Sequence, residues 1–186
     1  MKKQLKSFLR VALLAVASCA LCVGASAHAA KEPAKTEQPK STASPAPAAV
    51  LSAKDKSFMK DAAKGGMMEV DMGKMAQQKG KSPDVKKIGD RMVSDHSKAN
   101  AELMAIAKKK GVDLSKEKPA THKMDEANFD KSYVDMMVKD HEKDLAAFQA
   151  EAKNGSDADV KAFASKTSEV VKKHLEMVKA AQAKLK

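Results

Sequence analysis

Four stretches of the chain place apolar or small side chains every three or four residues, which is the spacing of one face of an α-helix. They cover about residues 53–79, 83–110, 130–154 and 157–185, and no stretch shows the alternation expected of a β-strand. The links between them are short except the one in the middle. This pattern predicts an all-α fold, an antiparallel four-helix bundle over residues 52–186.

Polar residues mark where the predicted helices begin. Ser52 with Asp55 forms a capping-box pair at the first helix, Ser82 caps the second, and Ser156 with Asp159 is predicted to cap the fourth. The third helix is predicted to begin with an Asn or Asp cap near Asn128. The helix starts are therefore specified locally.

The first 29 residues have the pattern of an export signal. Four basic residues precede an apolar run over residues 11–24, and Ala27-His28-Ala29 fits the rule for signal-peptide cleavage. Residues 30–51 are rich in Pro, Ala and Lys and are predicted to form a disordered linker. We therefore expect a periplasmic protein whose mature chain has no transmembrane helix. The alternative is a lipoprotein attached through Cys19.

The net charge of +11 comes from lysine, because Arg91 is the only arginine outside the predicted signal. The chain has no Trp and a single Tyr. Proteins that bind nucleic acids commonly use arginine and aromatic side chains for base contacts, so we expect no nucleic-acid partner. Weak association with anionic lipid or envelope polymers is the interaction that this charge allows, and the partner is otherwise unknown.

A short motif occurs twice. Residues 92–98 and 137–143 share Met, Val, Asp, His and Lys at the same five positions. The helical period places His96 and His141 on the apolar faces, and turns Asp95 and Asp140 about 100° away from them.

Two further polar residues lie on the apolar faces of the other helices: Glu69 on the first and His174 on the fourth. In an up-down-up-down bundle their heights above one end would be ~24 Å for Glu69, ~21 Å for His96, and ~17 Å for His141 and His174. Each helix is thus predicted to send one ligand into the core at a similar level. A Zn, Cu, Fe or Mn ion is the predicted cofactor, and rings more than ~8 Å apart would contradict it. Asp95, Asp140 and Tyr133 are predicted to support these ligands by hydrogen bonds.

The same residues allow other interpretations. A buried network of His and Glu can set helix register without a metal, in a purely structural or interaction bundle. A metal-dependent oxidoreductase would need an open coordination position and a substrate channel, which the sequence does not reveal, and no catalytic residue is assigned. Methionines such as Met68 and Met72 suit either copper(I) or the filling of a core that has few aromatic residues.

Several segments resemble an exported family catalogued as domain of unknown function 4142. They are Phe58 to Glu69, Val93 to Asn100, Asn128 to His141, and Lys173-His174-Leu175. The resemblance implies a ferritin-like four-helix fold and a bacterial periplasmic or outer-membrane-associated location. It implies no established activity.

The chain departs from ferritin-like iron enzymes in one respect. Those proteins carry Glu-x-x-His on two helices, whereas Val93, Val138 and Val171 stand three positions before the histidines here. We therefore expect a histidine-rich site with a single metal, or a site that has lost its metal, rather than a carboxylate-rich di-iron centre. We do not carry over ferroxidase activity from the fold.

Overall fold

The computed structural model describes residues 51–185. Within them the chain forms four helices and no strand: α1 (Ala53–Lys79), α2 (Pro83–Lys109), α3 (Phe129–Asn154) and α4 (Ala158–Lys184). This confirms the predicted all-α fold, and the predicted helix ends differ from these bounds by at most one residue. The predicted export signal and nearly all of the predicted linker lie outside the described residues. No described helix is both long and apolar enough to cross a membrane.

The helix caps agree with the sequence at α1 and α2. Ser52 and Asp55 form the reciprocal capping box, and the Ser82 side chain accepts from the backbone N–H of Asp84. The predicted cap of α4 is wrong, because Asp157, not Ser156, accepts from the first backbone N–H groups of that helix. Ser156 donates its backbone N–H to the carboxylate of Asp55. The turn before α4 is thereby attached to the start of α1.

The cap of α3 differs from the other three. The residue at the cap position of α3 is Asn128, but its side chain makes no capping hydrogen bond. The side-chain amide of Asn128 donates instead to the carboxylate of Asp125.

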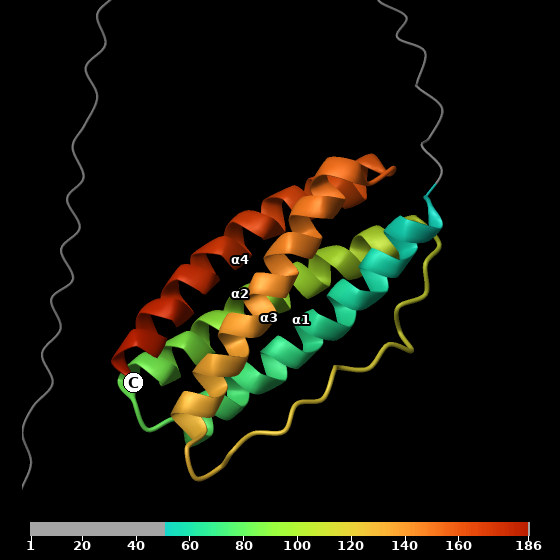
Figure 1. Ribbon diagram of the computed structural model, residues 1–186. Coiled ribbons are helices and arrows are strands. Elements are labelled where there is room, and N and C mark those ends of the chain that lie inside the picture. The colour runs from blue at the N-terminus through green and yellow to red at the C-terminus, as the bar shows by residue number, and fades with distance from the viewer. Residues whose placement is uncertain (1–50, 186) are drawn as a thin grey trace, which may run out of the picture. The chain divides into compact units, whose positions relative to one another are not determined.

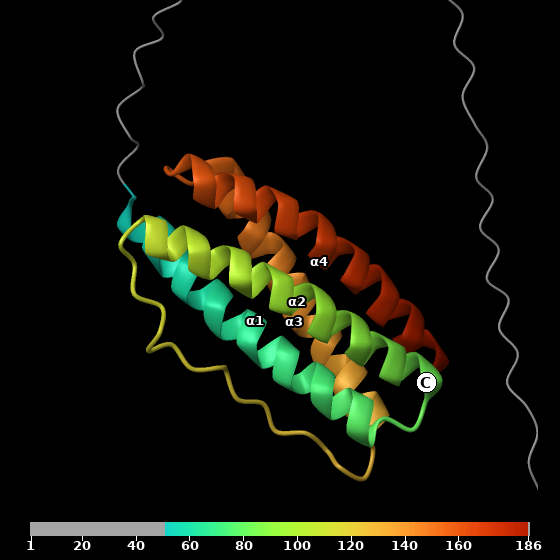
Figure 2. The same cartoon turned by 180° about the vertical axis from the view of Figure 1, so that it is seen from behind.

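The four helices form two hairpins joined by a long crossover link, residues 110–128 (Figures 1 and 2). The link runs along the outside of the bundle, so α3 starts where α2 starts and runs parallel to it. Asp130 accepts from the backbone N–H of Ser82, and Lys184 at the end of α4 contacts Asp84. The up-down-up-down order is therefore wrong. A link of this length can extend about 60 Å, enough to pass a helix of about 40 Å.

Two glycines bring α1 and α2 into backbone contact. A Cβ added at Gly73 would lie 2.9 Å from the carbonyl oxygen of Gly89, and one added at Gly89 would lie 2.6 Å from that of Gly73. Any larger residue at either position would push the helices apart.

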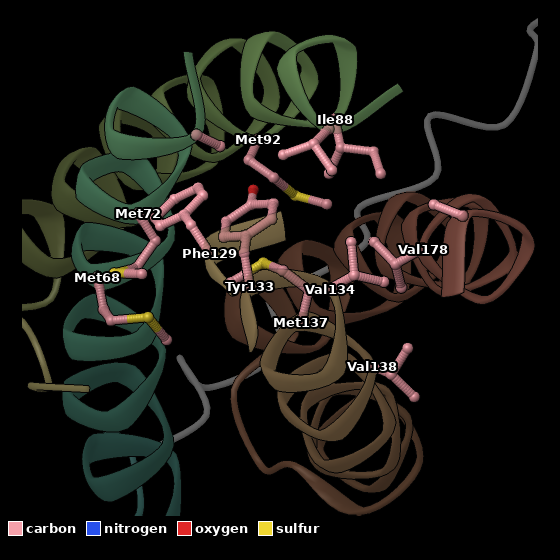
Figure 3. Packing of buried hydrophobic residues seen from close by; sticks show 13 residues of the cluster. Met68, Met72, Ile88, Met92, Phe129, Tyr133, Val134, Met137, Val138 and Val178 are labelled. Atoms are coloured by element: carbon pink, nitrogen blue, oxygen red, sulfur yellow. The ribbon is translucent and has the colours of Figure 1, made fainter. Parts of the chain in front are cut away.

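The apolar core consists of two clusters. One surrounds Tyr133 and Phe129, and its methionines Met68, Met72, Met92 and Met137 are buried (Figure 3). The other lies toward the opposite end of the helices and includes Met59, Leu103 and Phe163. Burial among apolar side chains favours the interpretation of these methionines as core filling.

Candidate metal centre

The four helices each contribute one buried polar residue at mid-length. Glu69, His96, His141 and His174 expose at most 5% of their surface. Measured from the end where α1 begins, the helical rise puts these residues at ~24, ~20, ~20 and ~24 Å. Both α3 and α4 run opposite to the assumed order. His141 and His174 lie near the middle of their helices, so they still share the level of Glu69 and His96.

The three imidazole rings are grouped around one point. Their centroids are 5.2 Å apart for His96 and His174, 5.5 Å for His141 and His174, and 5.8 Å for His96 and His141. One ring nitrogen of each lies within 4.8 Å of those of the other two. These distances are well inside the ~8 Å limit predicted for a shared metal. The three buried histidines could therefore hold a metal ion.

One nitrogen of each ring donates a hydrogen bond to a neighbouring acceptor. Nδ1 of His96 lies 2.8 Å from Oε2 of Glu69, and Nε2 of His174 lies 3.0 Å from Oδ2 of Asp95. Nδ1 of His141 lies 2.9 Å from the carbonyl oxygen of Met137 and 3.4 Å from Oε1 of Glu69. A carbonyl and two carboxylates can only accept, so these three nitrogens carry the protons.

The other nitrogen of each ring has no hydrogen-bond partner among the described residues. These nitrogens are Nε2 of His96, Nε2 of His141 and Nδ1 of His174. In the neutral tautomer that the partners select, each carries a lone pair. His141 and His174 therefore each hold a lone pair that no donor among the described residues uses, and His96 holds one whenever it is neutral.

The charge states differ among the rings. Burial lowers the pKa of His141, and it lowers that of His174 to about 4, so both are neutral at pH 7. Burial also favours the neutral form of His96, but the adjacent Glu69 carboxylate outweighs this effect and raises the pKa of His96. Burial likewise opposes ionisation of Glu69, yet the charge and hydrogen bond of His96 lower its pKa. The two form a buried ion pair.

The predicted supporting residues have different surroundings. Asp95 reaches His174 on a neighbouring helix and also lies 2.6 Å from Nε of Arg91. Asp140 faces the crossover link instead, where its Oδ2 is 3.4 Å from Nε2 of His122. Tyr133 stacks on Phe129, and its hydroxyl has no hydrogen-bond partner among the described residues.

The sequence analysis did not predict two groups that surround the histidines, the carbonyl of Met137 and the carboxyl of Asp144. The Met137 carbonyl is four residues before His141, which is the helical spacing that brings it to the ring. Asp144 lies one turn after His141, and it is only partly exposed. Burial, together with Glu69 and Asp140, raises the pKa of Asp144 to about 7. The sequence signal for both residues was their distance of three or four positions from His141, which places them one helical turn away from it.

Comparisons with curated proteins and with solved structures gave no match. A family model matches residues 40–181, most of the chain and nearly all of the four helices. The resemblance predicted from the sequence is thereby confirmed. The chain belongs to the family described as domain of unknown function (DUF4142).

Proposed function

We propose that the protein binds a transition-metal ion in its core through His96, His141 and His174. The observation that carries this proposal is that every ring has one nitrogen bonded to an acceptor and one with no partner within residues 51–185. A buried polar atom without a partner costs about 1–3 kcal/mol. Three such atoms grouped in one core support a shared ligand that accepts their lone pairs.

In this proposal Glu69 orients a ligand and is not one itself, which differs from the ligand role predicted from the sequence. Its Oε2 is occupied by the N–H of His96, at the nitrogen opposite the free one. Asp95 does the same for His174, and the carbonyl of Met137 for His141. Metal-binding histidines in proteins usually donate their second N–H to such acceptors, which fix the tautomer and raise ligand basicity.

Three histidine ligands reduce the number of metals that the site would accept. Three imidazoles suit Zn, Cu or Fe, whereas Mn prefers oxygen ligands. Nitrogens bound at about 2.0–2.1 Å to one tetrahedral ion would be about 3.3 Å apart. The rings, whose nitrogens lie within 4.8 Å of one another, would therefore move inward on binding. Three protein donors leave a fourth position for solvent or a small ligand.

We further propose that the protein is exported to the periplasm. The basic, apolar and small-residue segments of residues 1–29 support export to the periplasm. Weak association with anionic envelope surfaces is supported by the lysine-rich composition.

The test is metal analysis of the purified mature protein after reconstitution with Zn²⁺, Cu²⁺ or Fe²⁺ and removal of free ions. We expect about one ion per chain for the wild type and loss of the ion in His96→Ala and His141→Ala. His122→Ala, at an exposed histidine of the link, is the matched control and should retain the ion. A wild type that holds no more metal than the two core variants would overturn the proposal.

The second candidate is a bundle in which the polar core only sets helix register. The buried Glu69–His96 pair at 2.8 Å favours it, because such a pair fixes the alignment of α1 on α2. The two candidates differ in the melting temperature on metal addition. Metal bound to the native state alone raises it, whereas a purely structural core leaves it unchanged.

A further inference from the structure

A cavity of about 290 Å³ lies between α1 and α3, and the crossover link covers it. The link is attached on both sides. Lys64 of α1 contacts Glu117 and Ala120, and Asp140 of α3 contacts His122. Three carboxylates line this outer cavity, those of Asp61, Asp140 and Asp144, against two lysines, Lys64 and Lys143. Phe58 and Phe148 complete its wall. It is therefore a partly acidic chamber at the side of the bundle.

A smaller cavity of about 10 Å³ lies next to the outer one and reaches His96. Both cavities are lined by Asp144 and Phe148, so the two adjoin. The inner cavity is also lined by His96 and by Glu69, whose buried Oε1 has no hydrogen-bond partner in the part of the chain that the structure describes. It is large enough for about one water molecule.

Glycines of α1 make room along this path. A Cβ at Gly66 would overlap the side chain of Asn100, another residue that lines the inner cavity. At Gly65 the nearest atom to an added Cβ is Oδ2 of Asp144, at 3.8 Å. Gly66 is thus required for the approach of Asn100 to α1 beside the inner cavity, whereas Gly65 leaves room for a methyl group next to Asp144.

Other approaches are less suited to a cation. Apolar clusters fill the core on both sides of the histidine level. A groove between α2 and α4 reaches His174, but Lys87, Arg91 and Lys173 line it against a single carboxylate, Asp90. A positively charged groove repels a metal ion, whereas carboxylates concentrate it.

We infer that divalent metal ions reach the three-histidine centre through the α1–α3 side, passing from Asp140 to Asp144 and then to Glu69 and His96. This inference rests on the proposed function. His122, which contacts Asp140, covers the outer end of the route. Because the inner cavity holds about one water, the ion loses most of its hydration shell at Asp144. Asp144 thus replaces water ligands for an ion in transit and is absent from the final ligand set.

The experiment is stopped-flow mixing of the metal-free protein with Co²⁺, followed by the visible absorbance of the histidine-bound ion. Release into excess chelator gives the reverse rate. Asp144→Asn should slow both rates by about tenfold or more and leave Kd nearly unchanged, because a group used only in transit alters the barrier alone. His122→Ala should accelerate both rates. Asp90→Asn, a carboxylate in the α2–α4 groove, is the matched control and should leave the rates unchanged.

Equal rates for the wild type and Asp144→Asn, with melting curves showing that both are folded, would overturn the route while leaving the metal centre intact. An equal slowing by Asp90→Asn would also overturn it. If the wild type binds no Co²⁺ at equilibrium, the proposed function fails, and the route fails with it.

Discussion

The carboxylate of Glu69 and the imidazole of His96 form an ion pair in the middle of the bundle, with Oε2 2.8 Å from Nδ1 and neither side chain more than 6% exposed. Burial disfavours both charges, yet each partner shifts the pKa of the other toward the charged form. The pair also fixes which nitrogen of His96 is left free for a metal. Alignment of α1 on α2 and preparation of the ligand therefore depend on the same contact.

Replacing Glu69 with Gln tests whether this residue is a ligand or an orienting partner. The amide oxygen can still accept from His96, but the negative charge is lost. We expect metal affinity to fall by about 10–100-fold, as for other residues that orient a ligand. His96→Ala should remove binding altogether. Equal losses in competition titrations of the two variants would show that Glu69 binds the metal directly.

Metal affinity should rise with pH around neutrality. A protonated His96 has no lone pair to give, and its pKa is raised above 6.5, so binding displaces one proton from it. Below that pKa the affinity should rise about tenfold per pH unit, and above it the affinity should level off. His174, with a pKa of about 4, adds no proton in this range. Calorimetry in buffers of different ionisation enthalpy measures the proton count, and a count of zero at pH 6 would contradict this expectation.

His141 should tolerate Leu better than Ala in the metal-free protein. Its side chain is fully buried, so Ala leaves a cavity and is expected to cost about 2–4 kcal/mol, whereas Leu fills most of the space. Both substitutions remove the hydrogen bond to Met137, so that loss cancels in the comparison. Thermal unfolding of the two variants measures the difference, and equal melting temperatures would count against it.

Glu151 should make the protein less stable as pH rises. It is 2% exposed, and burial together with the neighbouring Asp55 raises its pKa to about 7. The folded state therefore holds a proton that the unfolded state loses near pH 4.5, so stability falls between about pH 4.5 and pH 7 and is then constant.

Glu151→Gln should remove this pH dependence, since the amide cannot ionise. We expect the variant to be roughly 1–3 kcal/mol more stable than the wild type at pH 8 and similar to it at pH 4. Urea unfolding at the two pH values measures both quantities. A wild type and variant that differ equally at pH 4 and pH 8 would show that Glu151 ionises normally.

The contact between Gly73 and Gly89 predicts opposite effects at two glycines of α1. Gly73→Ala places a Cβ 2.9 Å from the carbonyl oxygen of Gly89 and should destabilise the protein by about 1–3 kcal/mol. Gly65→Ala meets only Oδ2 of Asp144, at 3.8 Å, and should be neutral or stabilising by up to about 1 kcal/mol through helix propensity. Denaturant midpoints of the pair measure the contrast, which disappears if α1 and α2 are not in backbone contact.

The helices could be predicted because their determinants are local. The apolar period of each segment and caps such as Ser52 with Asp55 specify where a helix begins and which face turns inward. His96, His141 and His174 were found this way. The predicted Ser156 cap failed because Asp157 is an equally suitable cap one residue later, and Ser156 donates to Asp55, about 100 residues away in the sequence.

The roles of the carboxylates could not be predicted in the same way. The helical period correctly predicted that Asp95 points away from His96. Only the packing of α4 against α2, however, brings Asp95 to His174. Asp140 has the same sequence context as Asp95, yet it faces His122 in the crossover link. Similar local motifs therefore acquire different partners, because each partner comes from a different part of the chain.

The sequence by itself determined four helices and one inward polar residue on each, because helix formation and facing depend on residues within one or two turns. Only the tertiary structure decided that α3 runs parallel to α2, that Glu69 lies behind His96, and that the crossover link covers the α1–α3 side. Those outcomes depend on contacts between distant segments and on distances of a few ångströms, which a periodic pattern does not encode.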